Sequence, residues 1–456
     1  MSLDTRNRLI KPLWTLRGCW IRVFIGLYDT FHSIPAFSIS YQNLTMGTRN
    51  KKELDMSEDK PIVISGGGIG GLAIARMLAF SGRKSVVLEK AEEFGEIGAG
   101  IQLGPNTHRA FDALKVKEAM QQIAWFPRDM IMMDSITGEE ILRMPSGRSL
   151  TPFFGEPYAV IHRADLHAVL FDACSKMDEI DLRTSSEVTD YSESGDSVCV
   201  SLSDGEEIEC EALIGADGLW SNIRSSIVGD GDPVVSGHIA YRAVLPIDQV
   251  PAELGQWIDD VVLWGGARNH LVHYRLRRGQ LFNIVAVFHS SRYVEGWDEY
   301  GDPDELYAHF EGVQAPVKAL LDKINVWKMW VLCDRVPVKE WSRGRVTLLG
   351  DAAHPTLQYL AAGAGMAMED AICLANCIEN NQDNIVEAFK AYPAERYLRT
   401  ARVQLTARLY GDLYHAEGVA RELRNQLLGG KKEPGSNPYA GMAWLYQKDS
   451  GQPGGI

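Results

Sequence analysis

Residues 62–71 read Ile62-Val63-Ile64-Ser65-Gly66-Gly67-Gly68-Ile69-Gly70-Gly71, an apolar run that ends in glycines. Glycine at the first, third and sixth places of 66–71 predicts a buried strand that turns into a helix, where backbone N–H groups can approach a pyrophosphate. Glu89 ends the next predicted strand, where a carboxylate can bind ribose hydroxyls. The stretch 62–89 therefore predicts a dinucleotide-binding unit, although such glycines also serve packing alone and Glu89 could simply be solvated.

Two later segments combine glycine with aspartate. Gly215-Ala216-Asp217-Gly218 fits a tight turn close to a cofactor, and a purely structural turn explains it equally well. Gly350-Asp351 follows the apolar strand 346–349 and precedes the small-residue stretch 361–367. That stretch opens a predicted helix whose N-terminus could approach a flat anionic ring, and Asp351 could bind the ribityl hydroxyls of a flavin. An ordinary loop is the alternative for this segment alone, but the three segments together indicate a flavin enzyme.

The composition is that of a large acidic globular protein. The chain has 456 residues, 45% of them hydrophobic, with a formal charge of -14 and a pI near 5.3. This charge argues against a nucleic-acid-binding surface, which needs a basic excess. The seven cysteines are scattered without a Cys-x-x-Cys pair or clustered histidines, so we expect neither a metal site nor a disulfide framework, and a cytoplasmic location.

The hydrophobic pattern predicts an α/β fold: a Rossmann-like FAD-binding domain, an interleaved β-sheet substrate domain and a C-terminal helical region. Strand patterns occur at 238–246, 261–264, 270–275 and 281–289. Pro393 marks a break in the last helical stretch, 385–428, and glycines and prolines predict a loosely ordered end at 429–456. The predicted parts are an N-terminal extension (1–56), two parts of the FAD-binding domain (57–232 and 342–380), the substrate domain (233–341), and C-terminal helices with a loose tail (381–456).

The first 56 residues have a composition of their own, rich in arginine and apolar residues. The apolar run 19–27 is too short to cross a bilayer and is interrupted by Arg22. We expect an upstream extension without a catalytic role and no stable membrane insertion. A transit-type presequence is the alternative, and Met56 stands where a compact chain would naturally start.

The three segments in this order, with Ile161-His162-Arg163-Ala164-Asp165-Leu166 between the first two, resemble the class A flavoprotein aromatic hydroxylases over about 60–428. The resemblance implies bound FAD, NADH or NADPH as a transient electron donor, and O2 as co-substrate. It also implies a set of cofactor-binding residues from the first and third segments, the end of the second predicted strand, the stretch 98–102 and the segment 161–166. These are Gly66, Gly68, Gly70, Gly71, Glu89, Lys90, Gly100, Ile101, Gln102, Arg163, Asp351 and Gly363.

The chain departs from the common form of that family, in which a proline and Gly-x-Gly follow the Gly-Asp segment. It has Leu357-Gln358-Tyr359-Leu360-Ala361-Ala362-Gly363-Ala364 instead. Together with His270-Leu271-Val272-His273-Tyr274, this variant is similar to the 3-hydroxybenzoate 6-hydroxylase branch of the family. The resemblance implies that His270, Tyr274 and Gln358 line the substrate pocket and act in catalysis. A half-buried polar histidine and a core tyrosine are the alternatives.

The implied reaction is oxygen transfer from a flavin hydroperoxide to a small aromatic acid, which converts 3-hydroxybenzoate into gentisate. Histidine has an unperturbed pKa near working pH, so His270 could take the phenolic proton, while Gln358 could bind a substrate oxygen. The sequence assigns no arginine to the substrate carboxylate: Arg242 and Arg275 flank the β-rich pocket, with surface positions equally compatible. The long C-terminal helices could support a homodimer. The alternatives are a salicylate-type or hydroxypyridine-carboxylate hydroxylase, an FAD-dependent dehydrogenase without oxygen insertion, and a non-enzymatic nucleotide-binding scaffold.

Overall fold

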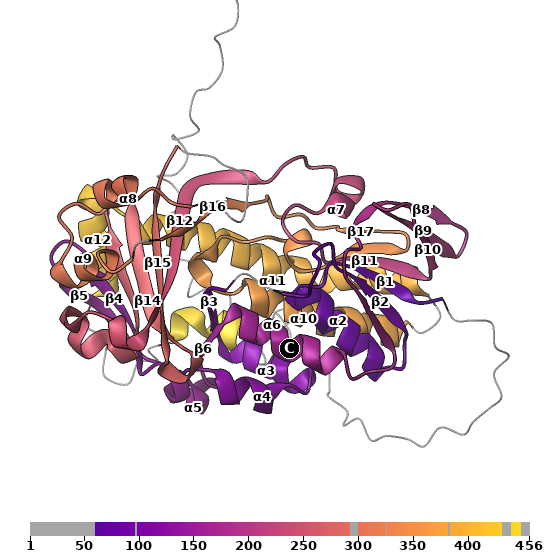
Figure 1. Cartoon of the computed structure of the whole chain (residues 1–456), viewed down its shortest axis with the longest axis horizontal. Coiled ribbons are helices and arrows are strands. Elements are labelled where there is room, and N and C mark those ends of the chain that lie inside the picture. Colours follow the sequence, from indigo (N-terminus) through magenta and orange to yellow (C-terminus); the bar gives the residue numbers. More distant parts are fainter. Residues whose placement is uncertain are drawn as a thin grey trace, which may run out of the picture. The chain divides into compact units, whose positions relative to one another are not determined.

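The computed structural model describes residues 60–95, 98–291, 300–324, 326–381, 384–430 and 439–447. The predicted N-terminal extension lies outside these residues. Figure 1 shows the arrangement of the described elements, coloured along the sequence. No helix among the described residues is long and apolar enough to cross a membrane.

The strand before the first glycine segment, β1, lies in a six-stranded sheet of order β17-β18-β11-β1-β2-β7. Its strands are parallel except for the edge pair β17–β18. Each of the strands β1, β2 and β11 has four residues, and all of them are buried, as expected for a parallel sheet covered on both faces. The strands span Ile62–Ser65 (β1), Ser85–Leu88 (β2), Ile180–Arg183 (β7), Ala212–Gly215 (β11), Ser342–Arg343 (β17) and Val346–Leu348 (β18).

The second large sheet has seven strands in the order β16-β12-β15-β14-β13-β4-β5. Four strands fall on the predicted strand patterns, and β4 and β5 join them from an earlier part of the chain, since β13 pairs with β4 in parallel. This sheet is therefore interleaved with the first, as predicted. The strands span Asp129–Asp134 (β4), Glu140–Pro145 (β5), Val234–Pro246 (β12), Val261–Gly266 (β13), Asn269–Leu276 (β14), Leu281–His289 (β15) and Lys328–Asp334 (β16).

Two smaller sheets complete the strands. The three-stranded sheet β10-β9-β8 comprises Val188–Ser194 (β8), Ser197–Leu202 (β9) and Glu207–Cys210 (β10), with residues 203–206 connecting the antiparallel strands β9 and β10. The pair β3–β6, Gly100–Leu103 and Ala159–His162, brings the stretch 98–102 beside the Arg163 segment.

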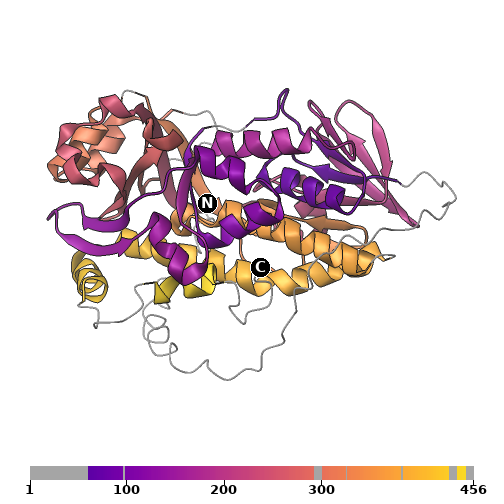
Figure 2. The same ribbon diagram turned by 90° about the horizontal axis from the view of Figure 1, so that it is seen from below.

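Helices connect the two large sheets (Figures 1 and 2). The helix α10 packs against α2, α3 and α11, and α2 also packs against α6. The longer helices span Ile69–Phe80 (α2), Pro105–Ala113 (α3), Arg163–Cys174 (α6), Gly363–Asn380 (α10), Ile385–Tyr414 (α11) and Gly418–Leu428 (α12). The shorter ones span Lys117–Ile123 (α4), Thr151–Phe154 (α5), Asn222–Ile227 (α7), Pro303–His309 (α8), Ala315–Leu321 (α9) and Ala443–Tyr446 (α13). The turns η5 (Gly350–Ala352) and η6 (Gln358–Leu360) precede α10.

Two predictions about the C-terminal region were wrong. Pro393 lies inside α11, which continues to Tyr414, and the break comes only before Gly418. Buried ion pairs on the next turn of this helix hold its backbone against α10, which offsets the cost of a proline in a helix. The tail is also not uniformly loose, because α13 packs with Leu445 and Tyr446 buried.

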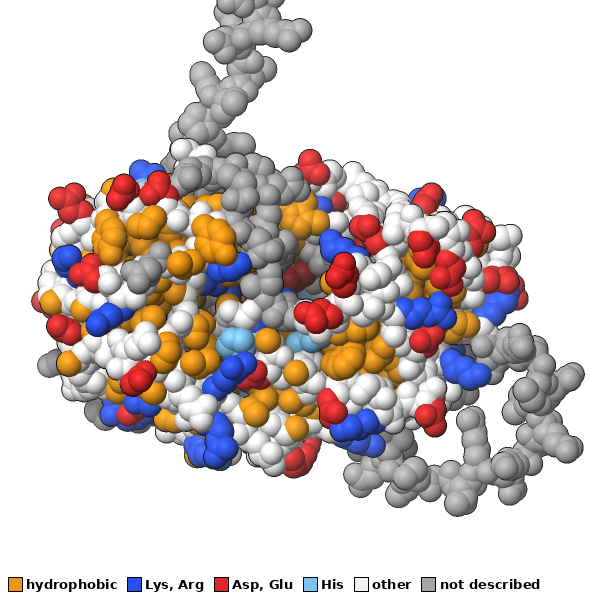
Figure 3. Space-filling view, in the orientation of Figure 1, with side chains coloured by type: hydrophobic (Ala, Val, Ile, Leu, Met, Phe, Trp, Pro, Cys, Tyr) orange, Lys and Arg blue, Asp and Glu red, His pale blue; other side chains and the backbone are white. Residues whose placement is uncertain are grey.

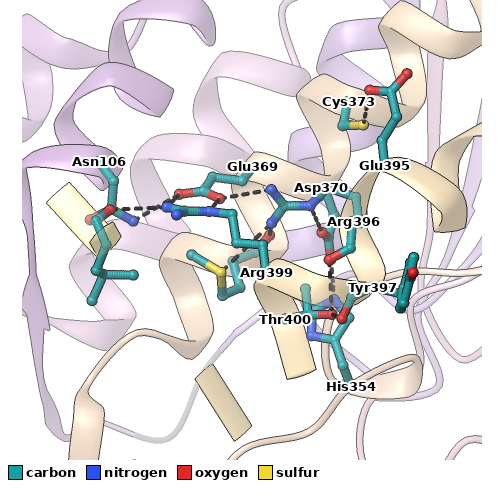
Figure 4. A network of polar contacts seen from close by, with 12 residues as sticks. Asn106, His354, Glu369, Asp370, Cys373, Glu395, Arg396, Tyr397, Arg399 and Thr400 are labelled. Carbon is teal, nitrogen blue, oxygen red and sulfur yellow. Dashed lines mark hydrogen bonds and ion pairs between the residues drawn. The ribbon is translucent and has the colours of Figure 1, made fainter. Parts of the chain in front are cut away.

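A network of buried charges joins α10 to α11 and to the Gly350 turn (Figure 4). The carboxylate of Glu369 forms ion pairs with Arg396 at 2.8 Å and with Arg399 at 2.7 Å. The carboxylate of Asp370 forms an ion pair with Arg396 at 2.7 Å. The other oxygen of Asp370 accepts from Nε2 of His354 at 2.5 Å and from the N–H of Gly350 at 3.2 Å. Each carboxylate is therefore paired, which buried charges require, and Asp370 fixes the turn that carries Asp351.

Candidate active site

One cavity of about 830 Å³ is lined by residues of both large sheets. The glycine turn and Glu89 line one part of it, and side chains of β12 and β14 line another. The cavity brings together fourteen of the fifteen predicted site residues, and Gly71 is the exception. Its lining includes Gly66, Gly68, Gly70, Glu89, Lys90, Gly100, Ile101, Gln102, Arg163, His270, Tyr274, Asp351, Gln358 and Gly363.

The glycine turn is shaped for close approach. Gly66 has a φ of +106°, which L side chains rarely adopt, and a Cβ on Gly71 would lie 1.9 Å from the carbonyl oxygen of Gly66. Gly71 therefore serves the packing of the turn rather than the cavity wall. The helix α2 begins after Gly68 without a side-chain cap, so its first N–H groups are available to an anion. Glu89 accepts a 2.9 Å hydrogen bond from the N–H of Gly67, which holds the carboxylate beside the turn.

The third segment lines the same cavity. The helix α10 also begins without a side-chain cap, and Gly363 and Ala364 at its start line the cavity together with Asp351. Asp217 and Gly218 of the middle segment line the cavity as well. Burial raises the pKa of Asp217, and its neighbour Ser221 caps α7. Two uncapped helix starts and two glycine turns around one cavity fit a dinucleotide with a flat ring system.

The alternation of side chains along β14 determines which of its residues line the second part of the cavity. His270, Val272 and Tyr274 line the cavity, because side chains two residues apart share one face of a strand. His273 points to the other face, where its Nε2 accepts a 3.1 Å hydrogen bond from Trp264. Gly100 approaches this wall so closely that a Cβ there would lie 2.5 Å from the ring of Tyr274.

The titratable side chains of this wall are held neutral. Burial lowers the pKa of His270 to about 3, with a smaller contribution from His238. Burial also raises the pKa of Tyr274, against the opposing effects of Arg242 and Gln102. At neutral pH, His270 therefore presents an uncharged imidazole, one ring nitrogen of which can accept a hydrogen bond.

Arg242 is the cationic group of the wall. It extends from β12, its guanidinium carbon lies 5.3 Å from the ring centre of Trp330, and it donates a hydrogen bond to Gln358. Within the described part of the chain Arg242 forms no salt bridge, and burial lowers its pKa to about 10. A guanidinium in such a place calls for an anion from outside the protein. The second candidate, Arg275, pairs with Asp259 at 2.8 Å and does not line the cavity.

Several residues of the site had no signal in the sequence. Tyr158 donates to Gln102, and Oδ1 of Asn283 accepts from the N–H of Gly100 at 2.9 Å. Tyr414 and Tyr446 line the cavity from the C-terminal region. The buried charges Glu369 and Asp370 did have a signal, because they interrupt the apolar pattern of a predicted helix.

The geometry describes a flavin site beside a pocket for a small anionic ligand, and comparison with known proteins agrees. The family described as "FAD binding domain" matches residues 59–404, and the chain belongs to this family of class A flavoprotein aromatic hydroxylases. It is therefore an FAD-dependent aromatic monooxygenase, as predicted, and the residues of the glycine turns fit the cofactor.

Similarity to individual proteins is high over most of the chain. It is 46% identical over 393 residues to 3-hydroxybenzoate 6-hydroxylase 1 of Aquipseudomonas alcaligenes, covering 85% of this chain and 98% of that protein. It is 44% identical over 384 residues to 3-hydroxybenzoate 6-hydroxylase of Klebsiella oxytoca, covering 84% of this chain and 96% of that protein. Among solved structures, Klebsiella pneumoniae HpxO complexed with FAD and uric acid superimposes with a TM-score of 0.73 at 25% identity. The match covers 84% of this chain and 95% of that chain.

Proposed function

We propose that this protein hydroxylates 3-hydroxybenzoate at the position para to its hydroxyl group and so forms gentisate. The observation that carries the proposal is that one wall of the cavity holds both Arg242, which pairs with no carboxylate of the described residues, and the neutral His270. The cation suits the carboxylate of the substrate, and the histidine suits its phenolic hydroxyl group. The similarity to two 3-hydroxybenzoate 6-hydroxylases supports the same substrate.

Each group has a separate task in this proposal. Arg242 binds the substrate carboxylate, because a buried guanidinium and a carboxylate form strong charge-assisted hydrogen bonds. Its hydrogen bond to the side-chain oxygen of Gln358 leaves the amide NH2 of Gln358 to donate to a substrate oxygen. Tyr274 and Val272 pack against the ring from β14 and exclude water.

His270 acts on the hydroxyl group of the substrate. It accepts the phenolic proton, and the resulting phenolate raises the electron density at the para carbon of the ring. Bound FAD, reduced by NADH or NADPH, supplies the activated oxygen from O2. That carbon gains one oxygen atom and loses its hydrogen as a proton when the ring becomes aromatic again.

The test is product identification with the FAD-loaded full-length protein, NADH or NADPH, and a panel of aromatic acids. The panel contains 3-hydroxybenzoate, 4-hydroxybenzoate, salicylate and 6-hydroxynicotinate. We expect gentisate from 3-hydroxybenzoate in a one-to-one ratio to the nicotinamide oxidised. Catechol from salicylate with 3-hydroxybenzoate left untouched, or nicotinamide oxidation without any hydroxylated product, would overturn the proposal.

A further inference from the structure

Four histidines from different elements meet behind the substrate wall. His238 lies on β12, His270 on β14, His289 on β15 and His415 directly after α11. The ring centre of His415 lies 4.8 Å from that of His238, 4.9 Å from that of His270 and 5.0 Å from that of His289. Of the four, His270 lines the cavity. The cluster therefore begins at the cavity wall and extends away from it.

Three of these rings form a continuous series of hydrogen bonds. Nδ1 of His270 lies 2.7 Å from Nε2 of His415, and Nδ1 of His415 lies 3.1 Å from Nε2 of His289. His270 and His415 are 3% and 5% exposed, whereas His289 is half-buried at the end of β15. His238 stands beside this series, because its Nδ1 pairs with the hydroxyl of Tyr359 at 2.5 Å.

We propose that His270, His415 and His289 form a proton relay that carries the phenolic proton of the bound substrate out of the cavity. This inference rests on the proposed function. The substrate hydroxyl gives its proton to Nε2 of His270 and keeps the electron pair of the O–H bond. The proton on Nδ1 of His270 moves to Nε2 of His415, that on Nδ1 of His415 to Nε2 of His289, and that on Nδ1 of His289 to water. One proton leaves, and each ring ends in its other tautomer.

The burial of the first two rings explains why a relay is needed. Burial lowers the pKa of His270 to about 3 and, with the neighbouring histidines, the pKa of His415 well below its ordinary value. Neither ring can hold a second proton for long, because an imidazolium is poorly solvated there. A proton taken from the substrate must therefore move on, and neutral rings in series offer both an acceptor and a donor at each step.

The groups around the relay favour this role over metal binding. His238, His289 and His415 have ligand atoms within 4.8 Å of one another, as a metal site requires. However, besides burial, the neighbouring Arg268 and His309 lower the pKa of His289 to about 4, and the positive charge of Arg268 opposes a cation. No carboxylate of the described residues pairs with the three relay rings. The hydroxyl of Tyr359, beside Asp412, has its pKa raised mainly by burial, as has that of Tyr414, so both stay neutral.

The test is stopped-flow measurement of proton release with a pH indicator, when FAD-loaded oxidised protein is mixed with 3-hydroxybenzoate. We expect His289→Ala to slow the release at least about tenfold, since positioned proton-transfer groups contribute about 10²–10⁴ in rate. Added imidazole should restore the rate, because His289 is half-buried and the truncation leaves room. His415→Gln should slow the release without such rescue. The equilibrium affinity for 3-hydroxybenzoate should change little in both variants.

The matched control is His108→Asn, whose buried ring on α3 packs against Phe111 at 5.5 Å outside the relay and should leave proton release unchanged. Proton release at the normal rate in His289→Ala would overturn the relay. Loss of release in the unmutated protein on treatment with EDTA would also overturn it, in favour of a metal site. Absence of any flavin spectral change with 3-hydroxybenzoate would instead refute the proposed function, so the two failures are distinguishable.

Discussion

The guanidinium of Arg242 donates a hydrogen bond to the side-chain oxygen of Gln358. This contact joins β12 to the turn before α10, and it orients an amide whose two ends are otherwise interchangeable. Because the oxygen faces Arg242, the NH2 group is left for a ligand. Gln358 is uncharged, and among the described residues no carboxylate pairs with Arg242, so the guanidinium can bind an anionic ligand, which underlies the first prediction.

Arg242→Met should weaken the binding of 3-hydroxybenzoate by about 10–100-fold, the value expected for hydrogen bonds to a charged group. Titration of the flavin absorbance measures the dissociation constant. The uncharged 3-hydroxybenzamide should lose much less affinity, because it has no carboxylate. Arg275→Met, which removes an arginine outside the cavity, should bind both ligands normally. An equal loss for the acid and the amide would contradict the role of Arg242.

His270→Asn should lower the rate of hydroxylation by about 10²–10⁴-fold while FAD stays bound, because the acceptor of the phenolic proton is lost. Product formation and the flavin spectrum measure the two effects. His273→Leu is the matched control on the same strand. It leaves the N–H of Trp264 unpaired and should cost about 1–3 kcal/mol of stability without a selective effect on turnover. Normal turnover in His270→Asn would refute its role.

Gly71→Ala should prevent FAD binding or folding, because the added Cβ would lie 1.9 Å from the carbonyl oxygen of Gly66. Cofactor content and the thermal unfolding midpoint measure the outcome. Gly95→Ala has no atom within 4 Å of its added Cβ and should behave like the unchanged protein. A fully FAD-loaded Gly71→Ala protein would show that the turn can relax around the new side chain.

Asp370→Asn should destabilise the fold by about 3–5 kcal/mol near neutral pH, because it leaves Arg396 with an incomplete counter-ion. Although burial alone would raise it, His354 and Arg396 lower the pKa of Asp370 to about 2. The carboxylate therefore contributes stability above its unfolded pKa of about 4, and the contribution is lost as pH falls towards 2. Denaturant unfolding across pH 2–7 should show a flatter pH dependence in the variant. Glu387→Gln, in an exposed pair with Lys390, should change stability by less than about 1 kcal/mol.

The sequence by itself determined the cofactor half of the site. Gly66, Gly68 and Gly70 sit within one local strand–turn–helix, and such a turn has the same geometry wherever it occurs. The strand at 281–289 was predicted with its observed bounds, because its apolar run is bounded by turn residues. The alternation of β14 likewise places His270 and Tyr274 on one face, which period-two geometry dictates.

Only the tertiary structure decided which other side chains meet there. The sequence gives no reason to prefer Arg242 over Arg275 as a ligand of the substrate. Strand pairing puts Arg242 on the cavity wall and Arg275 beside Asp259. Pro393 continues a helix because buried ion pairs outweigh its local cost. The relay of His270, His415 and His289 depends on two contacts of His415, with His289 126 positions away and with His270 145 positions away. Local pattern specifies conformation over a few residues, whereas contacts across such separations depend on how whole elements pack.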